Sequence, residues 1–217
     1  MKGDVIIVEE HHKKAASVIV PHIIEQVKNK PTRYTLTVGG ESGSGKSEMG
    51  RAIADELAKH GLKSVVLGQD DYYVLPPKTN DARHREDPEW LGPHVEVKLD
   101  VLDQNFVDAI NGADEITKPL IDYGANSISA ETVSLAGAKV VIAEGTYTTL
   151  LKHVDTKVFI ARTRQDTLEH RKKRNRFGEA QDPFVEQLLE TEHKIIAGHR
   201  YLADFLITKD YDVVVIE

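Results

Sequence analysis

The chain has 217 residues, of which 40% are hydrophobic, and a formal net charge of −7. This length and apolar content suffice for one sizeable core, so we expect one domain with an appended lid. The negative charge argues against a dedicated nucleic-acid binder, and the absence of cysteine excludes disulfides and cysteine-ligated metals. No apolar run approaches a membrane span, so we expect a soluble cytoplasmic protein without a membrane partner.

The first thirty residues precede the first strong motif. Val5 to Val8 form a short β-like run, and residues 11–30 have a helical pattern that Pro21 should kink or restart. We expect residues 1–30 to be an N-terminal extension packed on a domain that spans residues 31–217.

A phosphate-binding loop follows. Gly40 to Ser47 read GESGSGKS, which matches the pattern GxxxxGK[ST]. A strand-like run precedes this motif. Residues 46–60 have the spacing of a helix, which Gly61 is well placed to end. Glycines let the backbone N–H groups turn inward, and the positive end of the helix dipole adds to the same anion site. A glycine-rich turn that only links strand to helix is the alternative. We predict an ATP site with Lys46 on the outer phosphates and Ser47 on Mg²⁺, formed by Gly40, Glu41, Ser42, Gly43, Ser44, Gly45, Lys46, Ser47 and Glu48.

The middle of the chain alternates strand and helix patterns. Val65 to Leu67 is expected as a buried strand and Leu99 to Ile110 as a helix. Residues 72–95 are rich in proline, charge and histidine, which favours a substrate-facing loop. Two strand-like segments, Glu115 to Asp122 and Ser127 to Leu135, flank turn residues and predict a small antiparallel flap.

The last part of the chain completes the alternation. Lys139 to Ala143 and Thr156 to Ile160 predict central parallel strands. Residues 165–176 predict a basic helix, residues 183–205 a long amphipathic helix, and residues 212–216 a final strand. Together the segments predict an α/β fold with a doubly wound, mostly parallel sheet that binds nucleotide at the carboxyl ends of its strands.

Residues 65–73, which read VVLGQDDYY, indicate which class of phosphate-loop protein this chain resembles. The loop alone fits a kinase, a GTPase or a transport ATPase, but no NKxD-like guanine motif or LSGGQ-like signature occurs. A carboxylate at the end of this strand could face both the terminal phosphate and an incoming hydroxyl, so we predict Asp70 as the general base. Asp71 is the alternative base, and both could be solvated loop acids.

Several motifs together resemble the uridine kinase and phosphoribulokinase family of P-loop small-molecule kinases. They span residues 34–217 and comprise the phosphate loop, QDDYY at 69–73, PLIDY at 119–123, VIAEG at 141–145, the arginine-rich residues 164–176 and the terminal YDVVV. The resemblance implies ATP-dependent phosphorylation of a hydroxyl, with Asp70 as base and Tyr73 in the acceptor pocket. Glu144 follows a short apolar strand, and the resemblance places it beside Mg²⁺; a helix-dipole acid is the alternative.

An arginine cluster predicts a lid. Arg171 and Arg174 lie on one side of the predicted basic helix and Arg176 at its exit, and guanidinium groups suit phosphate oxygens. The resemblance assigns residues 162–182 to a lid that closes over ATP and excludes water. We predict Arg171 and Arg174 as catalytic and Arg176 as ATP-binding; a solvated basic face is the alternative.

The acceptor is the least determined part of the site. Uridine kinases carry a PxYDFxxH stretch, whereas this chain has PLIDYGANSIS without the histidine. The candidate acceptor-binding residues are Asp70, Tyr73, Asp122, Tyr123, Arg83 and His94. A nucleoside such as uridine is the leading acceptor; a sugar, sugar phosphate or pantothenate-like alcohol is second, and a regulatory ATPase is the alternative from another class. The expected partner is therefore a small-molecule acceptor, and homo-oligomer formation is left open.

Overall fold

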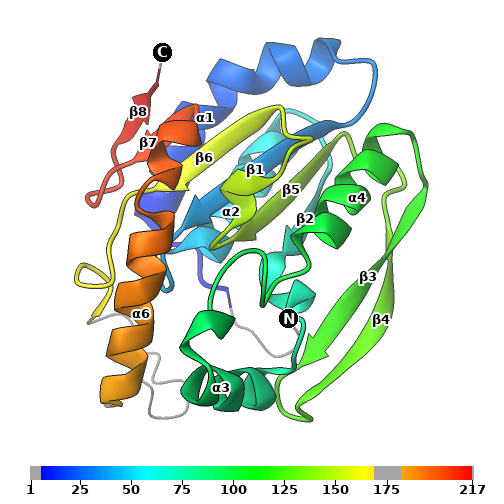
Figure 1. The fold of residues 1–217 in the computed structure, drawn as a ribbon. Helices are drawn as coiled ribbons and strands as arrows, with labels where there is room; N and C mark the ends of the chain where they lie inside the picture. The colour runs from blue at the N-terminus through cyan, green and yellow to red at the C-terminus, as the bar shows by residue number, and fades with distance from the viewer. Residues whose placement is uncertain (1–5, 169–181, 217) are drawn as a thin grey trace.

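A six-stranded sheet of order β2-β5-β1-β6-β7-β8 forms the centre of the computed structural model, which describes residues 6–168 and 182–216 (Figure 1). Five strands run parallel, and the last pairs antiparallel with β7. The strands are β1 (Tyr34–Gly40), β2 (Ser64–Gly68), β5 (Val140–Gly145), β6 (Thr156–Ile160), β7 (Phe205–Ile207) and β8 (Val213–Val215). This arrangement confirms the predicted α/β fold with a mostly parallel sheet.

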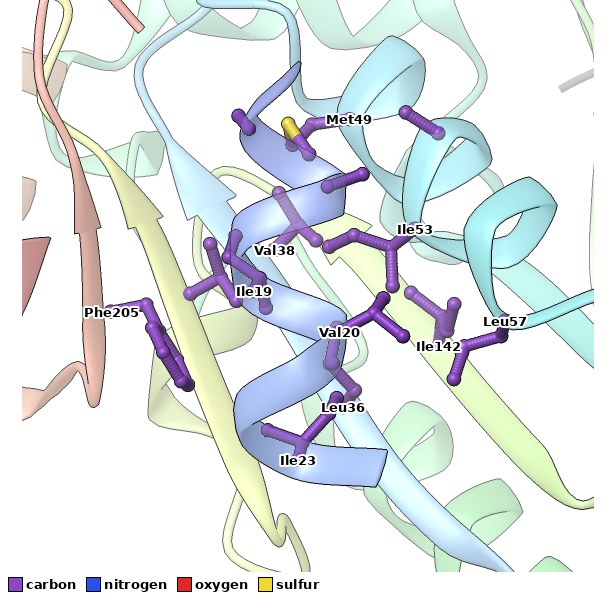
Figure 2. Packing of buried hydrophobic residues seen from close by; sticks show 14 of the residues in the cluster. Ile19, Val20, Ile23, Leu36, Val38, Met49, Ile53, Leu57, Ile142 and Phe205 are labelled. Carbon is purple, nitrogen blue, oxygen red and sulfur yellow. The ribbon is translucent and has the colours of Figure 1, made fainter. Parts of the chain in front are cut away.

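Helices α1 (Glu10–Asn29) and α2 (Lys46–Lys59) cover one face of this sheet (Figure 2). Ile19 of α1, Ile53 of α2 and Leu36 of β1 are fully buried in one cluster. Burying an aliphatic side chain of this size contributes about 1.5–3 kcal/mol. The helix of the N-terminal segment therefore belongs to the same core as the strand that leads into the phosphate loop.

Helix α4 (Leu99–Ile110) packs on the opposite face. Phe106 of α4 is buried in a second cluster with Val141, whereas the next residue of β5, Ile142, belongs to the first cluster. Because side chains alternate along a strand, β5 is buried on both faces, as a central parallel strand should be. The two clusters fix β5 and thereby the acid, Glu144, near its carboxyl end.

The flap is a separate antiparallel sheet of β3 (Glu115–Asp122) and β4 (Ser127–Ser134). The predicted flap and the predicted helix α4 are thus confirmed. Asn126 takes a left-handed φ of 50° in the connecting turn, a conformation that asparagine tolerates better than most residues. The Asn126 side chain accepts a hydrogen bond from the Lys78 backbone N–H at 2.8 Å. The tip of the flap therefore contacts the start of helix α3 (Pro77–Glu86).

Residues 72–95 are not the irregular loop that the sequence predicted. They contain α3 (Pro77–Glu86) and the short 3-10 helix η2 (Pro88–Trp90). Pro77 lies in the first turn of α3, where its missing N–H costs no helical hydrogen bond. Near the end of the helix, the Arg83 guanidinium donates a hydrogen bond to the Asp87 carboxylate, four residues later. The prediction was wrong because α3 is polar around its whole circumference and lacks the apolar stripe on which pattern reasoning depends.

The helix predicted over residues 183–205 is also shorter than expected. Helix α6 (Pro183–Ile196) is followed by the 3-10 helix η5 (His199–Leu202), and Phe205 begins β7 instead of ending a helix. Tyr201, within the predicted helix, is 74% exposed. Three apolar residues in a row, Phe205–Ile207, are too short a run to be distinguished from helix by periodicity, and pairing with β6 decides their state.

The N-terminal predictions need two corrections. Residues 6–8 form no strand, because no neighbouring strand pairs with them. Pro21 does not restart α1, which runs through it as one helix; Pro21 is exposed, and the neighbouring His22 places Nδ1 2.8 Å from the Val18 carbonyl. Within residues 6–168 and 182–216, none of the helices combines the length and the apolar character needed to cross a membrane.

Candidate active site

The phosphate loop lies where β1 ends and α2 begins, at the carboxyl edge of the sheet. Gly43 and Gly45 have left-handed φ angles of 76° and 96°, which glycine adopts without steric cost. A Cβ added to Gly45 would lie 2.5 Å from the Tyr211 hydroxyl, so a side chain there would also collide. The loop geometry, the N-terminus of α2 and Lys46 form a cradle that fits the phosphates of a nucleotide.

Residues distant in sequence support this loop from behind. The Tyr211 hydroxyl donates to the Ser44 carbonyl at 3.1 Å, and Arg162 donates to the Tyr211 hydroxyl at 3.0 Å. His12 of α1 lies against the ring of Tyr211, with 5.0 Å between the ring centroids. The sequence patterns did not reveal these supporting residues, because nothing local links them to the loop.

Glu144 lies beside the loop at the end of β5. Its partner in the neighbouring strand is Gly68, two residues before Asp70, and the Ser47 hydroxyl acts on its carboxylate. Burial raises the pKa of Glu144 to about 7; Asp70 raises it further, whereas Lys46 and the Ser47 bond act in the opposite direction. The structure thus brings Ser47, Lys46, Glu144 and Asp70 together. The oxygens of Ser47, Glu144 and Asp70 are the hard ligands that suit Mg²⁺ and its water shell.

The adjacent acids Asp70 and Asp71 have different environments. Both lie in the 3-10 helix η1 (Gln69–Tyr72) that follows β2. Asp71 is buried, contacts the Lys118 ammonium at 2.7 Å and accepts from the Ile121 N–H at 3.0 Å. Asp70 is partly exposed, and in the described part of the chain no hydrogen bond holds its carboxylate. Asp71 is therefore occupied in fastening η1 to the flap, while Asp70 keeps its acceptor capacity.

Gln69 and Gly145 hold the two motif strands at a fixed distance. The Gln69 side-chain oxygen accepts from the Tyr147 N–H at 2.7 Å, and Gln69 is fully buried. A Cβ on Gly145 would lie 2.2 Å from the Cβ of Gln69, so only glycine fits there. This contact positions the chain just before Asp70 against the chain just after Glu144.

Glu96 is a buried acid that the sequence analysis did not single out. Its side chain, 1% exposed, accepts from the Gly92 N–H at 3.1 Å, the Tyr147 hydroxyl at 3.1 Å and the Asn80 amide at 3.2 Å. His84 Nε2 lies 3.0 Å from the same carboxylate. Four partners satisfy the carboxylate and tie α3 to the segment after β5.

Helix α6 contacts the phosphate loop through two successive residues. Glu192 accepts from the Ser42 N–H at 3.1 Å, and His193 Nδ1 lies 2.5 Å from Glu41. The second oxygen of Glu41 accepts from the Arg164 N–H at 2.5 Å, at the start of the predicted lid. Burial raises the pKa of Glu192 to about 7, while Lys46 and the Ser42 bond lower it. The first half of the loop is thus attached to α6.

The remaining predicted site residues lie at different depths. Tyr73 is joined to Val97 by an isolated β-bridge, and burial raises its pKa well above the ordinary value, with Glu96 and Asp70 adding to the effect. Arg83 binds Asp87 at 2.9 Å on the surface of α3, and His94 is exposed.

The other predicted residues belong to the flap, the loop and the lid. Asp122 accepts from the Ala125 N–H at 2.9 Å in the turn of the flap, where Tyr123 follows it. Glu48 lies in the first turn of α2, and the Lys46 ammonium donates to the Glu41 carbonyl at 2.9 Å. The predicted lid residues Arg171, Arg174 and Arg176 lie outside the described residues.

Comparison with known proteins places this geometry in a family. Residues 35–178 match the model of the "Phosphoribulokinase / Uridine kinase family". The chain is 29% identical over 196 residues to the bifunctional alpha-galactosidase/sucrose kinase AgaSK of Mediterraneibacter gnavus, which covers 85% of this chain and 21% of that protein. It is 31% identical to a uridine kinase of Staphylococcus carnosus, over 58% of this chain and 60% of that protein.

A solved structure agrees in fold. The D-glycerate 3-kinase of Cryptococcus neoformans var. grubii has a TM-score of 0.61 at 15% identity, over 96% of this chain and 99% of that chain. This chain spans about a fifth and three fifths of the lengths of the two sequence relatives above. The family match covers the phosphate loop, the QDDYY and VIAEG motifs and the start of the lid. The chain belongs to the phosphoribulokinase / uridine kinase family.

Proposed function

We propose that the protein is an ATP-dependent kinase that phosphorylates a hydroxyl of a small metabolite. The observation that carries this proposal is the convergence of two strand ends at the phosphate loop: β2 leads to Asp70 and β5 to Glu144, and Ser47 and Lys46 of the loop both act on the charge of Glu144. A base with free acceptor capacity beside a phosphate cradle is what transfer to an alcohol requires. Family membership and the motif match support ATP as the donor.

Asp70 is the proposed general base. The acceptor oxygen attacks the γ-phosphorus, its proton passes to Asp70, and the bond from the γ-phosphorus to the oxygen of the departing ADP breaks. Lys46 and the loop N–H groups neutralise the charge that moves onto the phosphate oxygens. Mg²⁺, when bound, would neutralise further charge, and Ser47 and Glu144 are its proposed holders. Arg171, Arg174 and Arg176 are proposed to close over ATP, on the resemblance alone.

Two acceptor classes are candidates. Relatives named uridine kinase favour a nucleoside, although the stretch after Pro119 departs from their pattern. The relative named as a sucrose kinase matches over 85% of this chain, whereas the uridine kinase matches over 58%, which favours a sugar. We propose a sugar or a nucleoside as acceptor, and tests should include both.

An acceptor panel tests the proposal. Nucleosides, sugars, sugar phosphates, glycerate and pantothenate are incubated with the protein, ATP and Mg²⁺, and ADP release is measured above the hydrolysis background. At least one acceptor should raise ADP release in proportion to its concentration. If no acceptor does so and a protein partner does, a regulatory ATPase replaces the kinase proposal.

A further inference from the structure

Two histidines and a glutamate meet at the start of α1. Glu9, His11 and His12 each offer one ligand atom, and these three atoms all lie within 4.8 Å of one another. Within residues 6–168 and 182–216, no other three histidine or acidic side chains gather in this way. The proposed phosphoryl transfer uses none of the three, so the cluster calls for an explanation of its own.

The separation of two of these groups fits a small four-coordinate ion. His11 Nε2 lies 3.6 Å from the Glu9 carboxylate. Two ligands of a tetrahedral zinc ion, each about 2.0–2.1 Å from the metal, lie about 3.3 Å apart. The Glu9 side chain is 62% exposed and that of His11 is 38% exposed. Both side chains are therefore able to make the small rotations that would complete a coordination shell.

His12 supplies a nitrogen lone pair close to the other two groups. Its Nδ1 accepts a hydrogen bond from the Glu9 N–H at 3.1 Å, so this nitrogen is the unprotonated one of a neutral imidazole. A neutral imidazole is the form that binds metals. The rings of His11 and His12 lie 4.0 Å apart between centroids. A metal would compete with the Glu9 N–H for this lone pair, which predicts a moderate affinity.

The charges around the cluster permit a bound cation. Lys13 pairs with Glu10 at 2.5 Å and Lys14 with Asp212 at 3.4 Å, so both neighbouring ammonium groups are neutralised by acids. The positive end of the α1 dipole opposes a cation at this end of the helix, and the negative charge of Glu9 acts against that opposition.

We propose that Glu9, His11 and His12 bind a divalent transition metal of the zinc class, with water as the fourth ligand. Two imidazoles and one carboxylate are a known ligand set for zinc, whereas Mg²⁺ and Ca²⁺ prefer oxygen ligands. The site is separate from the Mg²⁺ site proposed at Ser47 and Glu144, and it stands independently of the kinase proposal.

The ion would join the first turn of α1 to the back of the phosphate loop. His12 is buried, and a Cβ on Gly45 would lie 3.1 Å from its Nε2. The His11 ring lies 4.1 Å from the ring of Tyr211, whose hydroxyl donates to the Ser44 carbonyl. Because only the folded chain assembles the three ligands, zinc should raise the midpoint of thermal unfolding.

Calorimetry with protein that carries no affinity tag and has been treated with a chelator tests the site. In excess Mg²⁺, one Zn²⁺ ion should bind per chain, and Co²⁺ should give the visible absorption of a tetrahedral complex. His11→Ala should weaken zinc binding about 100-fold or more, because even the loss of an outer-shell partner costs about 10–100-fold. His22→Ala removes an exposed histidine of the same helix and should bind zinc like wild type.

Glu9→Gln separates ligation from folding. The exposed side chain keeps its size and loses the charge, so the circular dichroism spectrum should match wild type while zinc affinity falls about tenfold or more. No zinc binding by the wild-type protein, wild-type affinity in His11→Ala, or an equal loss in His22→Ala would overturn the site. None of these results depends on whether a kinase activity is measured.

Discussion

The phosphate loop and the proposed acceptor side of the site, residues 69–97, are held in different ways. The loop depends on main-chain conformation: left-handed glycines, the start of α2, and supporting contacts from Tyr211 and α6. The acceptor side depends on two buried carboxylates, Asp71 and Glu96, each of which joins segments far apart in sequence. Damage to the loop should therefore impair nucleotide binding first, whereas damage to the acceptor side should first impair stability or acceptor binding.

Asp70 sits where the two regions meet, and its removal gives the largest expected effect. Asp70→Asn should lower kcat by about 10²–10⁴-fold, the range for loss of a general base, because the proposed recipient of the acceptor proton is removed. The midpoint of thermal unfolding and ATP-analogue affinity should stay close to wild type, since Asp70 makes no hydrogen bond to another described residue. Steady-state kinetics with the preferred acceptor measures this, and near-normal turnover would remove Asp70 from the mechanism.

Asp71→Asn should have the opposite pattern. It leaves the buried Lys118 ammonium with the half-exposed Glu131 as its one acidic partner among the described residues, beside the Pro119 carbonyl at 3.1 Å, so the free energy of unfolding should fall by about 3–5 kcal/mol. Urea unfolding followed by circular dichroism measures this change. The control is Asp81→Asn, which removes an exposed partner of Arg85 and should cost about 1 kcal/mol or less. Equal losses in the two variants would contradict the assigned role of Asp71.

Gly45→Ala tests the conformational support of the loop. A φ of 96° and an approach of 2.5 Å between the new Cβ and the Tyr211 hydroxyl should lower the free energy of unfolding by about 1–3 kcal/mol. ATP-analogue affinity should fall as well, because the loop must shift. Gly198→Ala is the control: its φ is −78°, and a Cβ there meets no atom within 4 Å. Calorimetry measures the affinity of both variants for the ATP analogue. Wild-type affinity in Gly45→Ala would contradict the assigned role of Gly45.

The pH dependence of the ligand-free protein tests the burial of Glu144 at the end of β5. Glu144 has an ordinary pKa of 4.5 and a folded pKa of about 7, so the folded state keeps a proton that the unfolded state has released. Its contribution to stability is therefore present at about pH 4.5 and below, and is lost as the pH rises towards 7.

Buried His199 has a lowered pKa, so its own contribution to stability increases with pH in the same range, opposite to that of Glu144. Comparison of wild type with Glu144→Gln isolates the contribution of Glu144, because His199 is present in both proteins. The melting temperature of Glu144→Gln should rise relative to wild type between pH 5 and pH 8. A constant difference across that range would show that Glu144 is ionised throughout.

The donor side of the site could be predicted from the sequence because its determinants are local. The phosphate loop, its strand and its helix are contiguous, Glu144 follows an apolar strand run directly, and Asp70 lies three residues after another. The strands β5 and β6 and the helices α2 and α4 were predicted on the same basis, since short apolar runs and regular spacing decide their state.

Contacts between segments far apart in sequence could not be predicted in the same way. Nothing in the residues around Glu96 and Glu192 marks these two acids, and only the fold gives them their partners Tyr147 and Ser42. Helix α3 has no apolar stripe, and β7 is three residues long. Tertiary contacts decide both elements, so sequence periodicity carries no signal for them.

Product analysis tests the central claim most directly. The preferred acceptor, ATP and Mg²⁺ are incubated with wild-type protein and with Asp70→Asn, and ³¹P NMR follows the phosphorus species. For wild type, the account predicts a phosphate monoester of the acceptor that accumulates in equal amount with ADP, and for Asp70→Asn it predicts almost none. ADP accompanied only by inorganic phosphate, in equal amounts with both proteins, would contradict it.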